Sequence, residues 1–363
     1  MIANPTFRRV VIGAAMAVAF AAMVHTFVAM GWLRPVLVHG SSMASTYHGE
    51  HRLIECEECR SRIAVDALAT IDRCPACRSV MIDVSTPRQG DRLPAVRRSP
   101  TDGIQRWESV VLQSPEDART LLIKRVLGLP GEHVGFVDGD LWINQQRVVK
   151  SPRDQLVMRV PLSRFGPIQL REGQTWTSGP VTDDLEWNAG VTRRLNEVSD
   201  IMVEWVVDPA ASSQWRVEIT GRCALRFRGE DLAELLDADG NVLYEVSPGG
   251  GNPWTLSSFD RSVLLMAGGH TVFQTPLEAV EDDSEATVQI EAIRGEVTFE
   301  ELSLWRDVYY ETPAGPARRQ GDWRLKENEW FVVGDNQAVS RDSRHWAPRA
   351  GVPGRLIVGK PWP

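Results

Sequence analysis

Two adjacent cations, Lys124 and Arg125, lie inside an apolar stretch that begins at Leu121 and ends in the turn Pro130-Gly131. The stretch predicts a buried or half-buried strand. Because side chains alternate faces along a strand, we expect one of the two cations to face the interior. A lysine in a dry pocket has a lowered pKa, and its neutral amine can act as a general base. The alternative is a lysine that snorkels from an edge strand into water.

Two other stretches carry polar groups that could work with such a base. The segment Gly40-Ser41-Ser42-Met43 offers a serine hydroxyl, which becomes a good nucleophile only when a base takes its proton. Ser-Lys pairs are a known variant of the serine-histidine arrangement. The other stretch runs from Gly334 to Arg344 and combines carboxylates, an amide, hydroxyls and arginines. Taken alone, the two stretches could equally be a polar turn after an apolar segment and a charged surface turn.

Together the three stretches resemble type I signal peptidases, in motif and in order. That family has a Ser-Met motif after a membrane anchor, a Lys-Arg-Val-x-Gly-x-Pro-Gly strand and a late Gly-Asp-Asn-x-x-x-Ser-x-Asp-Ser-Arg box. The resemblance covers residues 8–55, 88–150 and 325–360. It implies that Ser42 is the nucleophile and Lys124 the base. The supporting residues that it implies are Met43 beside the cleft, Ser340 as a hydrogen-bond partner of Lys124, and Asp342 with Arg344 as a pair beneath the site.

The sequence departs from the family pattern near the nucleophile. Gly40 replaces a serine that helps to hold the oxyanion in some members, so backbone donors such as the Ser42 N–H would have to hold it. Ser45 takes the place of the usual proline and Tyr47 that of the usual leucine. These departures leave open an inactive paralogue that binds exported peptides. A Ser-His hydrolase that uses His39 or His345 would not explain the Lys124 strand.

The anchor that the resemblance requires is present. Residues 10–33 carry no charged side chain and, as a helix, would be about 36 Å long, which is enough to cross a bilayer. Arg8 and Arg9 precede the run, so the positive-inside rule predicts an N-terminus in the cytoplasm and a catalytic domain on the outer, periplasmic face of the cytoplasmic membrane. A cleaved secretory peptide is the alternative, but the run is long for one.

Four cysteines form two Cys-x-x-Cys pairs, Cys56 with Cys59 and Cys74 with Cys77. Their spacing is typical of a zinc ribbon, in which four thiolates hold a structural zinc and leave no position open for catalysis. Disulfides are the alternative, because this segment should lie outside the cytoplasm. A fifth residue of this type, Cys223, is expected to be a buried thiol. Insertions of this kind resemble those of planctomycete-like members of the family.

The chain of 363 residues is long enough for several domains, and its net charge of −8 argues against a nucleic-acid binder. We predict a mainly β protein with one N-terminal transmembrane helix. The predicted parts are an anchor at 1–34, a signal-peptidase-like antiparallel β core at 35–55, 85–150 and 321–363, a zinc ribbon at 56–84, and a linker followed by a β-sandwich, faintly jelly-roll or lectin-like, at 151–320. The sandwich prediction rests on alternating apolar residues, as at Trp215, Val217 and Ile219.

The predicted function is therefore that of a membrane-bound serine endopeptidase of the signal peptidase I type with a Ser42–Lys124 dyad. The resemblance implies exported preproteins as substrates, cut after a small-x-small segment such as Ala-x-Ala, with the bilayer and the secretion machinery as partners. We expect no cofactor for catalysis and a structural zinc ion. An anchored binding protein built on the zinc ribbon and the sandwich is the alternative from another class.

Overall fold

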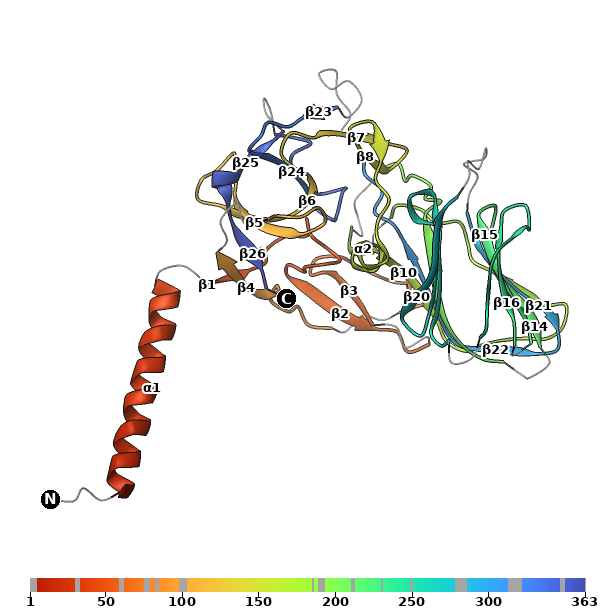
Figure 1. Ribbon diagram of the computed structural model, residues 1–363, viewed down its shortest axis with the longest axis horizontal. Coiled ribbons are helices and arrows are strands. Elements are labelled where there is room, and N and C mark those ends of the chain that lie inside the picture. Colours follow the sequence, from red (N-terminus) through yellow and green to blue (C-terminus); the bar gives the residue numbers. More distant parts are fainter. Residues whose placement is uncertain are drawn as a thin grey trace.

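The computed structural model describes residues 5–29, 33–58, 62–74, 79–81, 85–97, 103–184, 186–188, 193–209, 213–229, 231–248, 251–277, 286–312, 322–346 and 350–362. Within them the chain is mainly β, and the strands of every sheet pair antiparallel. Figure 1 shows a projecting helix, a β body next to it and a β-sandwich on the far side of that body. The predicted fold class is confirmed.

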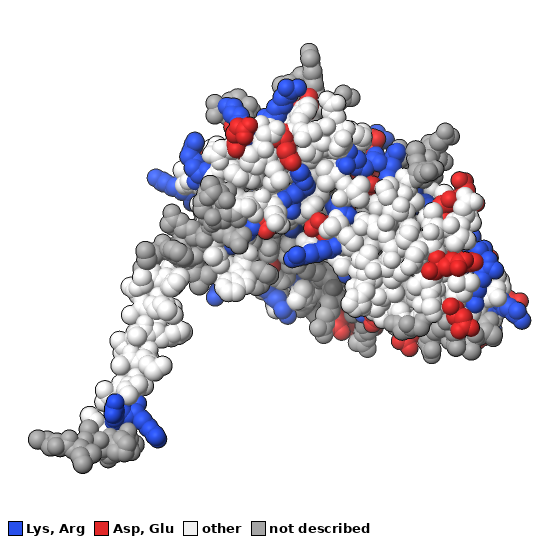
Figure 2. Space-filling model, in the orientation of Figure 1, with Lys and Arg blue, Asp and Glu red and all other residues white. Residues whose placement is uncertain are grey.

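The projecting helix is α1 (Pro5–Ala29). Its stretch from Phe7 to Val28 is apolar and, at 22 residues, long enough to cross a bilayer. Figure 2 shows no charged side chain along most of this helix and basic side chains near its N-terminal end. The helix ends earlier than predicted, because residues 33–37 form strand β1 (Leu33–Leu37). Pro35 disfavours helical geometry at the residue before it and so favours this extended segment.

The sheet that carries the predicted lysine strand has seven strands in the order β1-β4-β26-β5-β6-β24-β25. Its members besides β1 are β4 (Arg92–Arg97), β5 (Ser109–Gln113), β6 (Leu121–Gly128), β24 (Glu329–Val333), β25 (Val352–Pro353) and β26 (Ile357–Pro361). Strand β6 lies between β5 and β24, so residues from the first and last thirds of the chain meet there. The predicted strand around Lys124 is confirmed.

A smaller sheet contains β7 (His133–Val137), β8 (Asp140–Ile143), β9 (Gln146–Arg147) and β23 (Trp323–Arg324). Asp138 and Gly139 join β7 to β8 with φ angles of 51° and 88°, the left-handed geometry of a two-residue hairpin turn. This confirms the hairpin that the Asp-Gly pair predicts. Phe136 of β7 packs against Phe331 of β24, so the two sheets share a hydrophobic core.

Two further sheets pack face to face as a β-sandwich. One contains β10 (Val160–Phe165), β11 (Ile168–Leu170), β13 (Ile201–Pro209), β18 (Trp254–Ser257), β19 (Ser262–Ala267), β20 (His270–Pro276) and β22 (Val297–Arg306); the other contains β12 (Thr175–Thr177), β14 (Gln214–Ile219), β15 (Cys223–Arg228), β16 (Ala233–Asp237), β17 (Val242–Val246) and β21 (Val288–Arg294). Large side chains from both sheets fill the space between them, with Trp215 stacked on Phe227 and edge-on to Trp205. Cys223 is buried in the same core, as expected.

The start of this segment, predicted as a linker with some strand, is more regular than expected. Residues 152–177 form helix α2 (Pro152–Met158) and strands β10, β11 and β12, which pair with β22 and β21 of the sandwich. The abundance of Pro and Gly in this stretch suggested a linker, but hydrogen bonds to strands from the other end of the segment hold it in extended form. The apolar runs around Val297 and Leu302 also belong to one strand, β22, which has an irregular register against β13.

The cysteine-containing insertion contains a hairpin of β2 (His51–Glu55) and β3 (Arg62–Asp66). Ile54 and Val65 are buried on one of its faces. A short 3-10 helix from the sandwich segment, η1 (Glu186–Asn188), touches β3. The insertion therefore meets the sandwich segment next to the loop that carries Ser42.

Candidate active site

Ser42 lies in a loop between β1 and β2 that we call the nucleophile loop, residues 40–48. Gly40 has a φ of +72°, a left-handed conformation that glycine adopts without strain. A Cβ on Gly49 would lie 2.2 Å from the Gly40 carbonyl oxygen, so the two ends of the loop meet only because position 49 is glycine. Met43 is buried in a cluster with Val38 and other apolar residues and anchors the loop.

Lys124 reaches the nucleophile from the centre of the sheet. Its side chain is only 2% exposed, and its Nζ lies 3.0 Å from Ser42 Oγ and 2.9 Å from Ser340 Oγ. The alternative of a snorkelling edge lysine is therefore wrong, since β6 is an inner strand with neighbours on both sides. The structure brings together Ser42, Lys124 and Ser340, the three residues that the resemblance places at the reaction centre.

Burial decides the charge of the lysine. Loss of hydration lowers the pKa of Lys124 to about 8, and the nearby cation of Arg344 acts in the same direction, while the carboxylates of Asp342 and Asp335 oppose it. At mildly alkaline pH a large share of the amine is neutral and has a free lone pair. A neutral amine at hydrogen-bond distance from a serine hydroxyl can take its proton.

Ser340 gives the amine its orientation. The Ser340 hydroxyl donates to Asp342 Oδ2 at 2.6 Å, so its oxygen accepts a hydrogen bond from the Lys124 amine. With one N–H committed to Ser340, the lone pair of the neutral amine is left for the Ser42 hydroxyl. This contact also limits the rotamers of the long lysine side chain, as a positioned general base requires.

Asp342 and Arg344 form the predicted pair beneath the site. Arg344 donates from Nε to Asp342 Oδ1 at 2.9 Å and from Nη2 to Oδ2 at 2.8 Å, and both side chains are fully buried. Burial by itself would raise the pKa of Asp342, but hydrogen bonds from His345 and Arg344 hold it well below its usual range. The carboxylate therefore stays ionised and keeps its hydrogen bond from Ser340.

The start of the Gly334–Arg344 box packs directly on the nucleophile loop. A Cβ on Gly334 would lie 2.3 Å from both the Ser42 carbonyl oxygen and Ser340 Oγ, so only glycine fits. The backbone N–H of Asn336 donates to the Ser42 carbonyl at 3.1 Å, and its side-chain Nδ2 donates to the Ser41 carbonyl at 2.9 Å. The box thus holds the backbone on both sides of the nucleophile.

Arg125 faces the other side of β6 and is also buried, although only one of the two cations was expected inside. Its Nε donates to Asp335 Oδ1 at 3.0 Å, and its Nη2 donates to Thr46 Oγ1 at 3.1 Å. Lys124 and Arg125 therefore clamp the nucleophile loop and the box from opposite faces of one strand. Sequence reasoning missed the roles of Thr46 and Asp335, although Asp335 lies within a motif that it singled out.

The histidines weighed as alternative bases lie elsewhere. His345 has its Nδ1 3.6 Å from Asp342 Oδ1, the carboxylate beneath the site. His39 is exposed. In the part of the chain that the structure describes, the basic side chain within hydrogen-bond distance of Ser42 Oγ is that of Lys124.

Two of the four predicted zinc ligands, Cys59 and Cys77, lie outside the described residues. The other two, Cys56 and Cys74, are buried and belong to one small cluster with Ile63 and Met81. Two buried thiols from different ends of the insertion that share a cluster fit a common metal site. The structure thus places half of the predicted ligand set together.

Three carboxylates elsewhere, those of Asp140, Asp200 and Asp260, have oxygens within 4.8 Å of one another. Asp260 pairs with Lys150 at 2.8 Å, and Asp140 pairs with Arg147 at 2.8 Å. Because side-chain cations already balance two of the three charges, we assign no cation to this group.

One of three comparisons with known proteins concerns the site. Residues 10–184 match the family described as signal peptidase, peptidase S26. No curated protein matches the chain. Among solved structures, a β-fructofuranosidase from Aspergillus kawachii complexed with glycerol is 11% identical, with 65% of this chain and 44% of that one covered and a TM-score of 0.28.

An exo-inulinase from Aspergillus awamori is 8% identical, with 75% of this chain and 59% of that one covered and a TM-score of 0.28. The chain spans about half the length of these two proteins, and likenesses of this size describe neither its fold nor its chemistry. The family match covers most of the apolar N-terminal helix, the nucleophile loop and the Lys124 strand, and the motifs meet in space. Over residues 10–184 the chain is therefore similar to signal peptidases of the peptidase S26 family.

Proposed function

We propose that the protein is a membrane-anchored serine endopeptidase that removes signal peptides from exported preproteins with a Ser42–Lys124 dyad. The observation that carries the proposal is the 3.0 Å separation of Lys124 Nζ and Ser42 Oγ at a buried lysine whose pKa is lowered to about 8. The match of residues 10–184 to the signal peptidase family supports the same conclusion from the sequence side.

In the proposed mechanism the neutral Lys124 amine takes the Ser42 proton while Oγ attacks the carbonyl carbon of the scissile peptide bond. The ammonium of Lys124 then gives its proton to the leaving amine, the C–N bond breaks and an ester joins the substrate to Ser42. The neutral amine next takes a proton from water, whose oxygen attacks the ester carbonyl carbon. The C–Oγ bond then breaks, the product leaves as a carboxylic acid, and the Lys124 ammonium returns its proton to Ser42 Oγ. The Ser42 N–H would donate to the oxyanion of each tetrahedral intermediate.

The proposed substrates carry small residues before the cut, as in Ala-x-Ala. Apolar side chains next to the nucleophile support this choice, namely Val38, Met43 and Ile123, which form one cluster. Shallow apolar pockets accept a methyl group and offer little to a charged side chain. Ser42 also follows the helix end at Ala29 closely in the chain, so a cut site near the membrane would suit preproteins whose own apolar segment lies in the same bilayer. The N-terminus would lie in the cytoplasm and the catalytic body on the outer face.

Cleavage of a preprotein with an Ala-x-Ala site by the detergent-solubilised protein tests the proposal. We expect Ser42→Ala and Lys124→Ala each to lower kcat by at least about 10³-fold, because the nucleophile and its base act as one unit. Lys326→Ala, which removes an exposed lysine, serves as the control with unchanged kcat. If the folded parent protein does not cut and forms no acyl-enzyme, the inactive peptide-binding paralogue suggested by Ser45 and Tyr47 is the better assignment.

We also propose that Cys56, Cys59, Cys74 and Cys77 hold one structural zinc ion. The zinc would join the two ends of an insertion that has only a small hydrophobic cluster of its own. Elemental analysis of the purified protein should find about one zinc per chain, and Cys56→Ser should lower that content without a direct loss at the dyad. Two intramolecular disulfides and no bound metal, measured by mass spectrometry, would contradict the proposal.

A further inference from the structure

We propose that Asn188, which belongs to the sandwich segment and to none of the three motifs, is a positioning residue that holds the oxyanion-binding peptide of the nucleophile loop through Asn336. This inference rests on the proposed function. It assigns to the inserted segment a part in the reaction centre, whereas the sequence suggested only a binding role for it.

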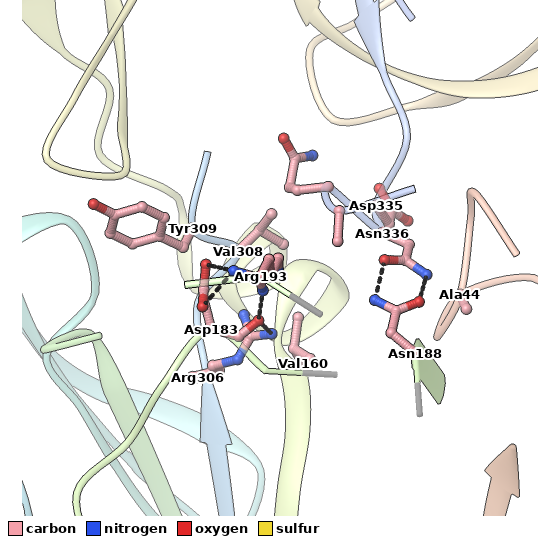
Figure 3. Close-up of a pocket in the computed structure, with 12 residues that line it drawn as sticks. Ala44, Val160, Asp183, Asn188, Arg193, Arg306, Val308, Tyr309, Asp335 and Asn336 are labelled. Atoms are coloured by element: carbon pink, nitrogen blue, oxygen red, sulfur yellow. Dashed lines mark hydrogen bonds and ion pairs between the residues drawn. The ribbon is translucent and has the colours of Figure 1, made fainter. Parts of the chain in front are cut away.

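The contact is a reciprocal pair of side-chain amides. Asn188 Nδ2 donates to Asn336 Oδ1 at 2.7 Å, and Asn336 Nδ2 donates back to Asn188 Oδ1 at 2.8 Å. Figure 3 shows the two side chains facing each other across the wall of a pocket, with Asp335 and Ala44 nearby. Asn336 is only 2% exposed, so Asn188 is one of its few possible partners.

The orientation of the Asn336 amide follows from its other contact. The Ser41 carbonyl can only accept, so the Asn336 group that faces it must be the NH₂. The Asn336 Oδ1 then points to position 188 and needs a donor there. Only a side chain with both a donor and an acceptor in this geometry satisfies both groups, and loss of Asn188 would leave a buried oxygen without its hydrogen bond.

The Ser41 carbonyl has a direct link to catalysis. It belongs to the same planar peptide unit as the Ser42 N–H, and in a trans peptide the two groups point in opposite directions. The Ser41 oxygen accepts from the Ala44 N–H at 3.1 Å inside the loop and from Asn336 at 2.9 Å outside it. Asn336 therefore helps to fix the direction of the Ser42 N–H, which is the proposed oxyanion donor. Asn188 holds Asn336 and in this way aims that donor.

Asn188 is itself held firmly enough to act in this way. Its neighbour Trp187 is 3% exposed and packs against the imidazoles of His48 and His51, with ring centroids 5.0 and 6.0 Å away. The η1 turn therefore touches the far end of the nucleophile loop directly at His48 and is linked to its start at Ser41 through Asn336. Asp183, a few residues earlier, is fixed by two hydrogen bonds from Arg193 at 2.9 Å.

The first test measures kcat and KM separately for Asn188→Ala. Because the interaction acts on the transition-state oxyanion, we expect kcat to fall about 10- to 100-fold with little change in KM. The control is Asn252→Ala, which removes an equivalent amide pair, to the Val207 N–H and C=O, inside the sandwich and away from the site. That variant should keep the parent kcat.

A double variant tests whether Asn188 affects kcat through Asn336 or independently of it. If Asn188 acts only through Asn336, Asn188→Ala combined with Asn336→Ala should have the kcat of Asn336→Ala alone. Three results would overturn the inference. They are a loss of kcat in the double variant equal to the product of the two single losses, an unchanged kcat in Asn188→Ala, and an equal loss of kcat in Asn252→Ala. In these cases the parent protein still cuts, so the dyad proposal would stand.

A second measurement does not depend on turnover. Amide hydrogen exchange of residues 40–48, measured in a Ser42→Ala background, should become faster when Asn188→Ala is added and stay unchanged when Asn252→Ala is added. Unchanged exchange with Asn188→Ala would overturn the positioning role even if the parent protein proved inactive. If the parent protein proves inactive but Asn188→Ala still makes the exchange faster, the positioning role of Asn188 is supported. In that case the lack of activity contradicts only the dyad proposal.

Discussion

The protein contains two fully buried lysines, and their surroundings give them opposite chemistry. Lys124 meets two hydroxyls, those of Ser42 and Ser340, and its pKa is lowered. Lys150 meets two carboxylates, Asp260 Oδ1 at 2.8 Å and Asp307 Oδ2 at 2.5 Å. The same side chain at the same burial is thus a candidate base in one place and a fixed cation in the other.

The electrostatic balance explains the difference. Burial by itself lowers the pKa of both lysines, but the charges of Asp260 and Asp307 raise that of Lys150 well above its ordinary value. At Lys124 the nearest carboxylate, that of Asp342, is already bound by Arg344 and separated from the amine by the Ser340 hydroxyl. The site keeps a hydrogen-bonding chain to an anion without letting that anion pair directly with the base.

The two regions also differ in purpose. Lys150 joins segments that are far apart in the sequence, because Asp260 comes from the η2 turn (Phe259–Arg261) and Asp307 follows β22. It also lies over the ring of Trp107, at 4.9 Å from the centroid. Lys150 therefore connects the sandwich to the β body, whereas the desolvated Lys124 costs stability and serves as the base in the proposed mechanism.

The largest difference in stability should come from Lys150→Met. Removal of the cation leaves two buried carboxylates without compensation, which destabilises a protein by about 3–5 kcal/mol. We expect a lower Tm and a lower urea midpoint, with Lys326→Met at an exposed site unchanged as the control. A Tm equal to that of the parent protein would show that the Lys150 cluster does not join the sandwich to the body.

Lys124→Met should raise the stability of the protein, whereas Lys150→Met lowers it. A shift of the lysine pKa from 10.5 to about 8 corresponds to about 3 kcal/mol of lost stability. Because the folded-state pKa is depressed, this cost is complete below pH 8, where both states are protonated, and vanishes above pH 10.5. The variant should therefore be more stable than the parent protein at pH 7 and equal to it near pH 11. A Lys124→Met variant that is less stable than the parent protein at pH 7 would contradict the claim that the buried charge of Lys124 costs stability.

The smallest effect concerns the pH dependence of cleavage. The acid limb of kcat/KM should lie near pH 8, with activity rising as Lys124 loses its proton. Arg344→Met removes a cation that lowers the pKa of Lys124 and leaves Asp342 more strongly negative towards it. Its acid limb should move up by about one pH unit. Arg341→Met, which removes an exposed arginine that pairs with Glu116, should leave the limb in place.

Much of the catalytic body could be predicted from local pattern. The apolar stretch around Lys124 and the Asp138-Gly139 turn became the strands and the hairpin that they indicate, because their periodicity and turn chemistry act over a few residues. The resemblance also named Ser42, Ser340, Asp342 and Arg344, and the structure brings these side chains together with Lys124. The start of the sandwich segment is more regular than predicted because strands β10 to β12 are stabilised by partners that lie over a hundred residues away.

The amino-acid sequence by itself determined the apolar N-terminal helix, the strand that carries Lys124, and the order of the three motifs, since each depends on a short pattern of residue types. Only the tertiary structure decided the protonation of the two lysines, because burial and partners from distant segments set a pKa. It also decided the place of Asn188, which lies in a stretch with no periodicity or motif. The proposed role of Asn188 follows only from its hydrogen bonds with the Asn336 amide.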